Sequence, residues 1–259
     1  MIIGLYIILI IIGIITGTIT SLVGASAVTL IVPALTILFH IGVHTAIGTS
    51  LFVDIITSIV VSYNYYKQKH VNLKSALWIA ISSIIGAQFG ANIANNTKGV
   101  TLSGLFGILL IFSGINELHK AKKNKNMPKM IQFKEKWEEI ITIIAIGIGI
   151  GILSGIFGAG GGMMVLISLI VFLHYPMHMA VGTSTLIMAI TAFSSDIGYF
   201  IHGHISFLYG ILLSIGAIIG GILGSKYANK INDNLLSKFL DYFFIIIGIM
   251  MLIQPIFNK

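Results

Sequence analysis

Apolar runs separated by short polar turns fill most of this chain. Several of the runs approach or exceed the roughly 20 residues that a helix needs to span a bilayer, which predicts an all-α polytopic membrane protein. Each half of the chain divides into five such segments. They lie at about 2–23, 28–39, 45–66, 74–95 and 99–118 in the first half, and at about 138–157, 162–173, 179–200, 208–229 and 233–253 in the second.

Two of these segments, 28–39 and 162–173, are too short to cross a bilayer alone. We interpret each as half of a broken or re-entrant element. Such breaks are tolerated in a membrane where the freed backbone groups face protein or a watery cavity. Segments 2–23 and 28–39 are compatible both with full crossings and with a re-entrant pair.

The second half repeats the first at one offset of 134 residues, without a gap. The string Ala-x-Gly-Thr-Ser stands at 46–50 and again at 180–184. Other matched pairs are Gly17 with Gly151, Gly24 with Gly158, His40 with His174, Tyr65 with Tyr199 and His70 with His204. Because chance identity does not hold one register over so long a stretch, we predict two homologous transmembrane repeats. They comprise residues 1–118 and 138–259, joined by a lysine-rich linker at 119–137.

Composition supports this interpretation and narrows the function. Only 9% of the residues are charged, compared with about 25% in a soluble domain. The chain has no cysteine, which excludes thiol catalysis, disulfides and cysteine-based metal sites. Nearly half of its lysines lie in the linker. A basic loop of this kind is typical of the cytoplasmic side of a membrane protein, and we expect a lipid bilayer rather than nucleic acid as its partner.

The lysines outside the linker change loops between the two halves. In the first half three lysines lie at 67–74, before or at the start of the fourth segment, and only Lys98 follows it, whereas in the second half three lysines follow it, at 226–238. The positive-inside rule places both groups in the cytoplasm, which predicts that one half is inverted relative to the other. Inversion requires an odd number of crossings per half. We therefore expect five crossings, or three with the first two segments forming a re-entrant pair.

A glycine-rich stretch interrupts the second half where a membrane helix would otherwise continue. Residues 151–162 read GILSGIFGAGGG, and each glycine costs a helix about 1 kcal/mol relative to alanine. Isolated glycines suit close helix packing, but a triplet exceeds that need. Its N–H groups, at the positive end of the next helix, form a candidate anion site. The candidate residues are Gly158, Gly160, Gly161 and Gly162, with Gly24, Ala25 and Ser26 at the matching break of the first half.

These motifs resemble a known family. The string GIGIGILSGIFGAGGGMMV at 147–165 and the string VPAL at 32–35 are similar to the signature of the TauE/SafE sulfite exporter family of anion permeases. The resemblance implies a secondary transporter in a bacterial or archaeal plasma membrane. Its expected cargo is a small anion such as sulfite, thiosulfate or a sulfonate. The two breaks differ in sequence, however, because ASAV at 25–28 stands where the second half has AGGG at 159–162, so we expect them to differ in shape.

A Gly-Thr-Ser triplet opens the third segment of each half. The hydroxyl groups of Thr49, Ser50, Thr183 and Ser184 can donate to an oxyanion without adding charge. They can equally bond to the preceding turn or across helices, as Ser and Thr commonly do in membranes. Both interpretations stay open at this point. Neutral donors suit a transporter, which must release what it binds.

Asp54 is the carboxylate placed deepest within an apolar segment. Ionisable groups at such a depth are expensive and functional by default. Because burial disfavours the charged form of a carboxyl group, we predict that Asp54 takes up a proton in one state and couples proton movement to anion movement. Its repeat partner is Met188, so this feature is one-sided. Asp196 lies nearer the end of its segment, where we expect it to reach the membrane interface.

Two histidine pairs, His40 with His44 and His174 with His178, have the i, i+4 spacing of a metal pair on a helix. Each pair straddles the turn before the third segment, so we favour interfacial histidines with no metal and no cofactor. A transporter of divalent metal or another cation, using Asp54 and these histidines, is the alternative function. A membrane enzyme is a third class, which we set aside because no spacing brings a nucleophile and a base together.

Overall fold

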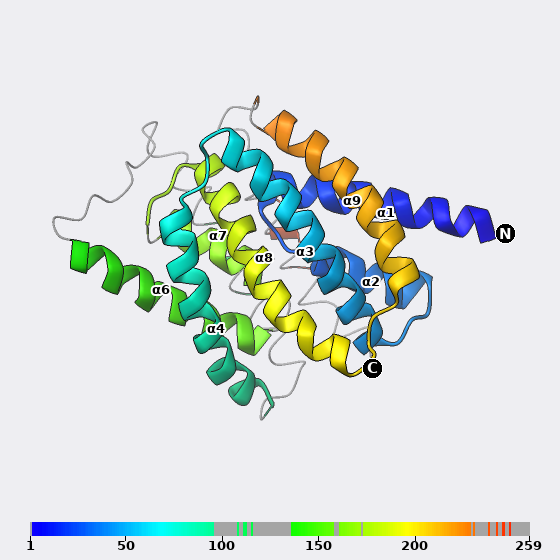
Figure 1. Cartoon of the computed structure of the whole chain (residues 1–259), viewed down its shortest axis with the longest axis horizontal. Helices are drawn as coiled ribbons and strands as arrows, with labels where there is room; N and C mark the ends of the chain where they lie inside the picture. Colours follow the sequence, from blue (N-terminus) through cyan, green and yellow to red (C-terminus); the bar gives the residue numbers. More distant parts are fainter. Residues whose placement is uncertain are drawn as a thin grey trace.

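The computed structural model of the chain is a bundle of helices (Figure 1). It describes residues 2–95, 136–157, 161–171 and 173–228, together with isolated positions beyond them. Every regular element within these residues is a helix. Four helical stretches among them are long and apolar enough to cross a membrane: Gly4–Val23, Thr45–Lys67, Met177–Ile201 and Phe207–Ala228. The predicted all-α membrane architecture is therefore confirmed for the described part of the chain.

The helix bounds agree within two residues with eight of the ten predicted segments. In chain order the helices are α1 (Ile2–Val23), α2 (Val28–Leu38), α3 (Val43–Lys67), α4 (Leu73–Asn95), α6 (Lys136–Phe157), α7 (Gly161–Val171), α8 (Met177–Ile201) and α9 (Phe207–Ala228). The other two predicted segments, 99–118 and 233–253, lie almost wholly outside the described residues, as does the linker at 119–137. The last two linker positions already belong to α6.

The helices α2 and α7 have 11 residues each. At a rise of 1.5 Å per residue this is about 16 Å of helix, roughly half the thickness of the hydrocarbon core. Each follows a long helix and precedes another after a short turn. Both elements are therefore half-length helices.

The first helix of each half packs against the fourth helix of the other half. α1 runs parallel to α9, since Gly13 lies against Leu213 and Gly17 lies against Ala217. α6 packs against α4 in the same parallel manner. At these glycines a Cβ atom would collide with the partner helix, so small residues let the backbones approach closely.

The two longest helices, α3 and α8, have 25 residues each and pack antiparallel at the centre of the bundle (Figure 1). Gly48 near the start of α3 lies against Tyr199 near the end of α8. Gly182 near the start of α8 lies against Tyr65 near the end of α3. The midpoint of each helix therefore lies near the centre of the bundle, which is where the helix breaks are found.

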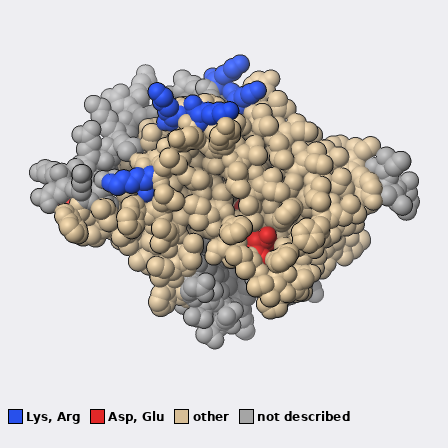
Figure 2. All heavy atoms as spheres, viewed as in Figure 1, with Lys and Arg blue, Asp and Glu red and all other residues tan. Residues whose placement is uncertain are grey.

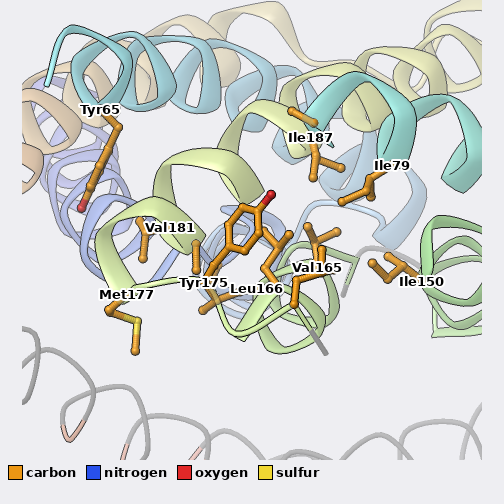
Figure 3. Packing of buried hydrophobic residues seen from close by; sticks show 14 of the residues in the cluster. Tyr65, Ile79, Ile150, Val165, Leu166, Tyr175, Met177, Val181 and Ile187 are labelled. Carbon is orange, nitrogen blue, oxygen red and sulfur yellow. The ribbon is translucent and has the colours of Figure 1, made fainter. Parts of the chain in front are cut away.

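A buried apolar cluster joins the two halves and fixes the position of α7 (Figure 3). The inner face of α7 contributes side chains that are at most 2% exposed, and these pack between α6 and α8. Dispersion contacts of this kind, rather than exclusion of water, hold helices together within a membrane. The residues of the cluster labelled in the view include Tyr65, Ile79, Ile150, Val165, Leu166, Val181 and Ile187.

Replacing Gly17 by valine should strongly destabilise the protein. A Cβ atom at this position would collide with the carbonyl oxygen of Ala217, a backbone atom that cannot rotate away. Overpacking of this kind costs about 1–3 kcal/mol and occasionally more, so we expect a lower melting temperature or little monodisperse protein. Gly4→Val is the matched control, because nothing lies within 4 Å of a Cβ built there. Equal melting temperatures for the two variants would contradict the close α1–α9 packing.

Lysine side chains gather at one end of the bundle. They lie between 67 and 74, at the α3–α4 turn, and between 226 and 230, at the end of α9. The side-chain amide of Asn64 in α3 donates a hydrogen bond of 3.0 Å to Ser225 in α9, which holds these two helix ends together. Figure 2 shows the lysines concentrated along one edge of the molecule. The positive-inside rule predicts that this end faces the cytoplasm.

Candidate functional site

The first helix break is a short buried turn between α1 and α2. Gly24 has a φ angle of 63°, a left-handed conformation that glycine adopts readily because it has no Cβ. Its N–H donates to the carbonyl of Thr20 at 2.8 Å. Ala25 and Ser26 are 1% and 5% exposed. The predicted break therefore lies inside the bundle.

Asp54 supplies the cap that the start of α2 lacks locally. The N-cap residue, Ala27, makes no side-chain cap. Its N–H instead donates to Oδ1 of Asp54 at 2.8 Å, and the Ser26 hydroxyl donates to Oδ2 at 2.7 Å. Asp54 is only 2% exposed and lies near the middle of α3. A helix N-terminus favours an anion through its N–H groups and its dipole, and here a carboxylate of the chain itself takes that position.

The start of α7 meets this first break at Gly162. A Cβ atom at Gly162 would stand 2.9 Å from the backbone nitrogen of Ser26 and would collide with the sulfur of Met188 in α8. Glycine alone permits so close an approach. The N-terminal ends of the two half-length helices, one from each half of the chain, therefore converge near Asp54.

The side chains around the meeting point are neutral apart from Asp54. Ser184 of α8 lies against Gly24, since a Cβ there would stand 2.7 Å from its Oγ. Ser58, one helical turn beyond Asp54, is fully buried, and its hydroxyl faces the Asp54 carboxylate. The helices α1, α2 and α7 contain no Asp, Glu, Lys or His. Asp54 is therefore stabilised by hydrogen-bond donors and not by a cationic side chain of these helices.

The two threonines predicted for the site hold the turns at the ends of the central helices. Oγ1 of Thr49 accepts a hydrogen bond of 2.9 Å from the N–H of Ser206, before α9. Oγ1 of Thr183 accepts one of 3.1 Å from the N–H of Asn72, before α4. For these two residues the structure shows the bonding between helical segments that the sequence had left open.

The structure distributes the other predicted residues unevenly. Ser50 is buried and donates to a carbonyl of its own helix at 2.7 Å. Gly161 begins α7. Gly158 and Gly160 lie outside the described residues. Among the candidates, the structure thus brings together Gly24, Ala25, Ser26, Asp54, Gly162 and Ser184.

The histidine pairs do not lie on continuous helices. His40 and His174 have left-handed φ angles of 52° and 53° in the turns before α3 and α8. Nε2 of His178 lies 2.8 Å from the carbonyl oxygen of Ala228, and its ring lies 5.4 Å from that of His70 between centroids. No three His, Asp or Glu side chains among the described residues come close enough to hold a metal ion.

Several polar and apolar residues of the interior were not foreseen as participants. Met188 faces the meeting point of the breaks, and the repeat register, which pairs it with Asp54, is the signal that identifies it. Ser58 follows from helical spacing, because residues four apart share a face. Asp196, near the end of α8, is 8% exposed, and its Oδ1 has no hydrogen-bond partner among the described residues; its position relative to the membrane interface stays a prediction.

Membrane-length helices surrounding two half-length helices that meet at a buried carboxylate define a polytopic membrane protein, with the discontinuous helices that are common in transporters. Comparison with known proteins supports this class. The family model described as sulfite exporter TauE/SafE matches residues 9–251. The chain therefore belongs to the TauE/SafE family, as its glycine-rich and VPAL motifs had indicated.

Curated relatives carry matching descriptions. The chain is 32% identical to the probable membrane transporter protein YunE of Bacillus subtilis, over 98% of this chain and 99% of that protein. It is 33% identical to a probable membrane transporter protein of Methanocaldococcus jannaschii, over 86% of each chain. Identity to the probable membrane transporter protein YdhB of Bacillus subtilis is 29%, over 80% of this chain and 83% of that protein. No solved structure matches the chain significantly. The protein is a membrane transporter with several crossings of the cell membrane.

Proposed function

We propose that this protein is a secondary transporter of a small sulfur oxyanion, namely sulfite, thiosulfate, a sulfonate or a related organosulfur anion. The observation that carries the proposal is the convergence of the α2 and α7 N-terminal ends at Ser26 and Gly162. Transporter sites commonly form where discontinuous helices of two repeats meet, and the positive ends of such half-helices point at anionic groups of the substrate. The description of the family as sulfite exporters gives the same class of cargo.

The proposed cargo site lies between the two breaks. Gly24, Ala25 and Ser26 line it from the first half, and Gly162 and Ser184 from the second, with Gly158, Gly160 and Gly161 adjoining in sequence. Thr49 and Thr183 are proposed to shape it from further away, through the bonds that they accept from the turns before α9 and α4, and Ser50 lies next to Thr49 on α3. Asp54 is the coupling residue. The other side chains around the proposed cargo site are neutral, which suits a site that binds and releases an anion in each cycle of alternating access.

We also propose that the halves are inverted repeats. The equivalent helices α3 and α8 run antiparallel, and the threonine contacts are reciprocal, with Thr49 bonded before α9 and Thr183 bonded before α4. α9 follows α8 through a short turn and so runs in the direction of α3. Since α1 is parallel to α9, α1 and α3 point the same way, and α2 must lead the chain back between them. This arrangement supports a re-entrant pair, α1 with α2, and three crossings in each half.

The geometry at Asp54 disfavours the alternative of a cation transporter. Both carboxylate oxygens already accept hydrogen bonds, from Ser26 and from Ala27. A cation bound at this carboxylate would lie against the N–H and O–H donors, whose positive ends repel it. The same donors are correctly polarised for an anion.

A thermal stability screen of the purified protein tests the proposed function. Sulfite, thiosulfate and methanesulfonate are compared with chloride and Zn²⁺. A ligand of the folded state stabilises it by about 2.7 kcal/mol when present at about 100 times its Kd, so at least one sulfur anion should raise the melting temperature where chloride does not. A shift with Zn²⁺ alone would favour the cation alternative. No shift with any of the three sulfur anions would contradict the proposal.

A further inference from the structure

We infer that the Asp54 carboxylate and the transported anion are alternative occupants of the donors at the start of α2, so that each anion is carried together with a proton. This inference rests on the proposed function. It adds the sign of the coupling, since proton and anion then move in the same direction through the protein.

The hydrogen bonds at the start of α2 support the first part of the inference, that the Asp54 carboxylate and the anion compete for the same donors. Asp54 takes the Ser26 hydroxyl and the Ala27 N–H. The next N–H, of Val28, donates to Oγ of Ser26 at 3.3 Å, and the two after it donate to the carbonyls of the turn at 3.3 and 3.2 Å. While Asp54 is charged, the donors of this helix end are thus engaged within the chain. An incoming oxyanion must displace the carboxylate to reach them.

The charges around Asp54 support the second part of the inference, that a proton accompanies each anion. Asp54 has no cationic partner on the helices that pack against α3, because their charged and titratable residues lie toward the helix ends. On α8, Asp196 is eight residues from Met188, about 12 Å along the helix axis. Two anions at one helix end would repel each other. The charged and titratable residues of α3 and of the helices packed against it, apart from Asp54, are the following. They are Tyr6 on α1, none on α2, His178, Asp196 and Tyr199 on α8, Tyr209, Lys226 and Tyr227 on α9, and His44, Tyr63, Tyr65, Tyr66 and Lys67 on α3 itself.

Protonation of Asp54 both frees the donors at the start of α2 and removes the repulsion between the carboxylate and the anion. A proton from solvent adds to one carboxylate oxygen of Asp54, and no bond of the cargo forms or breaks. The neutral carboxyl group then becomes a donor and can hydrogen-bond the anion. The Ser26 hydroxyl and the Ala27 N–H are then free to donate to the anion as well. The buried hydroxyl of Ser58, one turn away, already faces the Asp54 carboxyl group and can keep a hydrogen bond to it when it is displaced. Met188 stands at the equivalent position of the other half, so the repeat provides no second carboxyl group there.

Binding of thiosulfate to the purified full-length protein tests the inference, because thiosulfate itself does not titrate near neutral pH. One linked proton makes the Kd weaker by about tenfold per pH unit wherever the empty site is unprotonated, so the Kd should rise with pH in the alkaline part of the range. In weakly buffered solution near neutrality, adding thiosulfate should also make the medium more alkaline. Binding without proton uptake, with a Kd that does not change with pH, would overturn the inference and leave the proposed function standing.

Two variants identify the proton site. Asp54→Asn is neutral at every pH and keeps a donor, so it should bind thiosulfate with a Kd independent of pH and without proton uptake. Asp196→Asn removes the other carboxylate that is buried among the described residues and should retain the wild-type dependence of the Kd on pH. Competition by this carboxylate would be refuted if the Kd of Asp54→Asn for thiosulfate changed with pH as in the wild type. Loss of thiosulfate binding by a folded Asp54→Asn protein would refute it as well. If Asp54→Asn does not fold, Asp196→Asn decides, because proton uptake like that of the wild type supports Asp54 as the proton site and loss of uptake refutes it. If neither thiosulfate nor methanesulfonate binds the wild type, the proposed function fails, and the inference fails with it.

Discussion

Replacing Gly162 by valine should slow anion transport by more than about tenfold at anion concentrations below the Kd, while the protein still folds. The side chain of Met188 can rotate away from a new Cβ atom, but the backbone nitrogen of Ser26, 2.9 Å from that atom, cannot. The start of α7 must therefore move away from the first break. Loss of one hydrogen bond to a charged group costs about 1.5–3 kcal/mol, which corresponds to a Kd weaker by more than about tenfold. The buried cluster on the inner face of α7 should keep the helix in the bundle.

Transport of radiolabelled thiosulfate or sulfite into proteoliposomes measures this effect. Gly149→Val is the matched control, because it lies in the same glycine-rich region, on α6, and nothing stands within 4 Å of a Cβ built there. It should transport at the wild-type rate. Size-exclusion profiles of both variants establish that they fold. Wild-type transport by a folded Gly162→Val protein would mean that the approach of the two breaks serves packing and not transport.

The helices of this protein were largely predictable because their ends are marked in the sequence. Apolar runs of membrane length predict the spans, and glycines or polar residues end them. The start of α2 was predicted at Val28, where the structure has it. The start of α3 was predicted two residues late, at Thr45, because histidine before it obscured a helix that begins at Val43. Local patterns of this kind require no knowledge of which helices touch.

The partners across the bundle were not predictable in the same way. The cap on α2 comes from Asp54, 27 residues beyond Ala27, and depends on how α2 packs against α3. Likewise, Thr49 has the same local sequence whether its hydroxyl binds an anion or a turn. Oγ1 of Thr49 accepts a hydrogen bond from the backbone because the N–H of Ser206 lies beside it. No periodicity in the sequence specifies that position of Ser206. Serine and threonine hydroxyls serve either purpose, so only three-dimensional placement separates the candidates.

Cysteines introduced at Gln68 and His202 should be labelled from opposite sides of the membrane. These residues follow the ends of α3 and α8, helices that occupy equivalent places in the two halves and run antiparallel. The chain has no native cysteine, so the labelling has no background. Positions 72 and 206 of the same turns are less suitable, because the Asn72 side chain donates to Tyr175. An impermeant thiol reagent added to intact cells should reach His202→Cys and miss Gln68→Cys.

Lys226→Cys distinguishes inverted from parallel halves most directly. It lies in the same half as His202, yet the hydrogen bond between Asn64 and Ser225 places it at the end of the bundle that carries Gln68. The positive-inside rule puts this lysine-bearing end in the cytoplasm. Lys226→Cys should therefore be protected together with Gln68→Cys, and all three cysteines should react once the cells are permeabilised. Parallel halves would instead expose or protect positions 68 and 202 alike, since these are equivalent in the repeat, and that result would refute inversion.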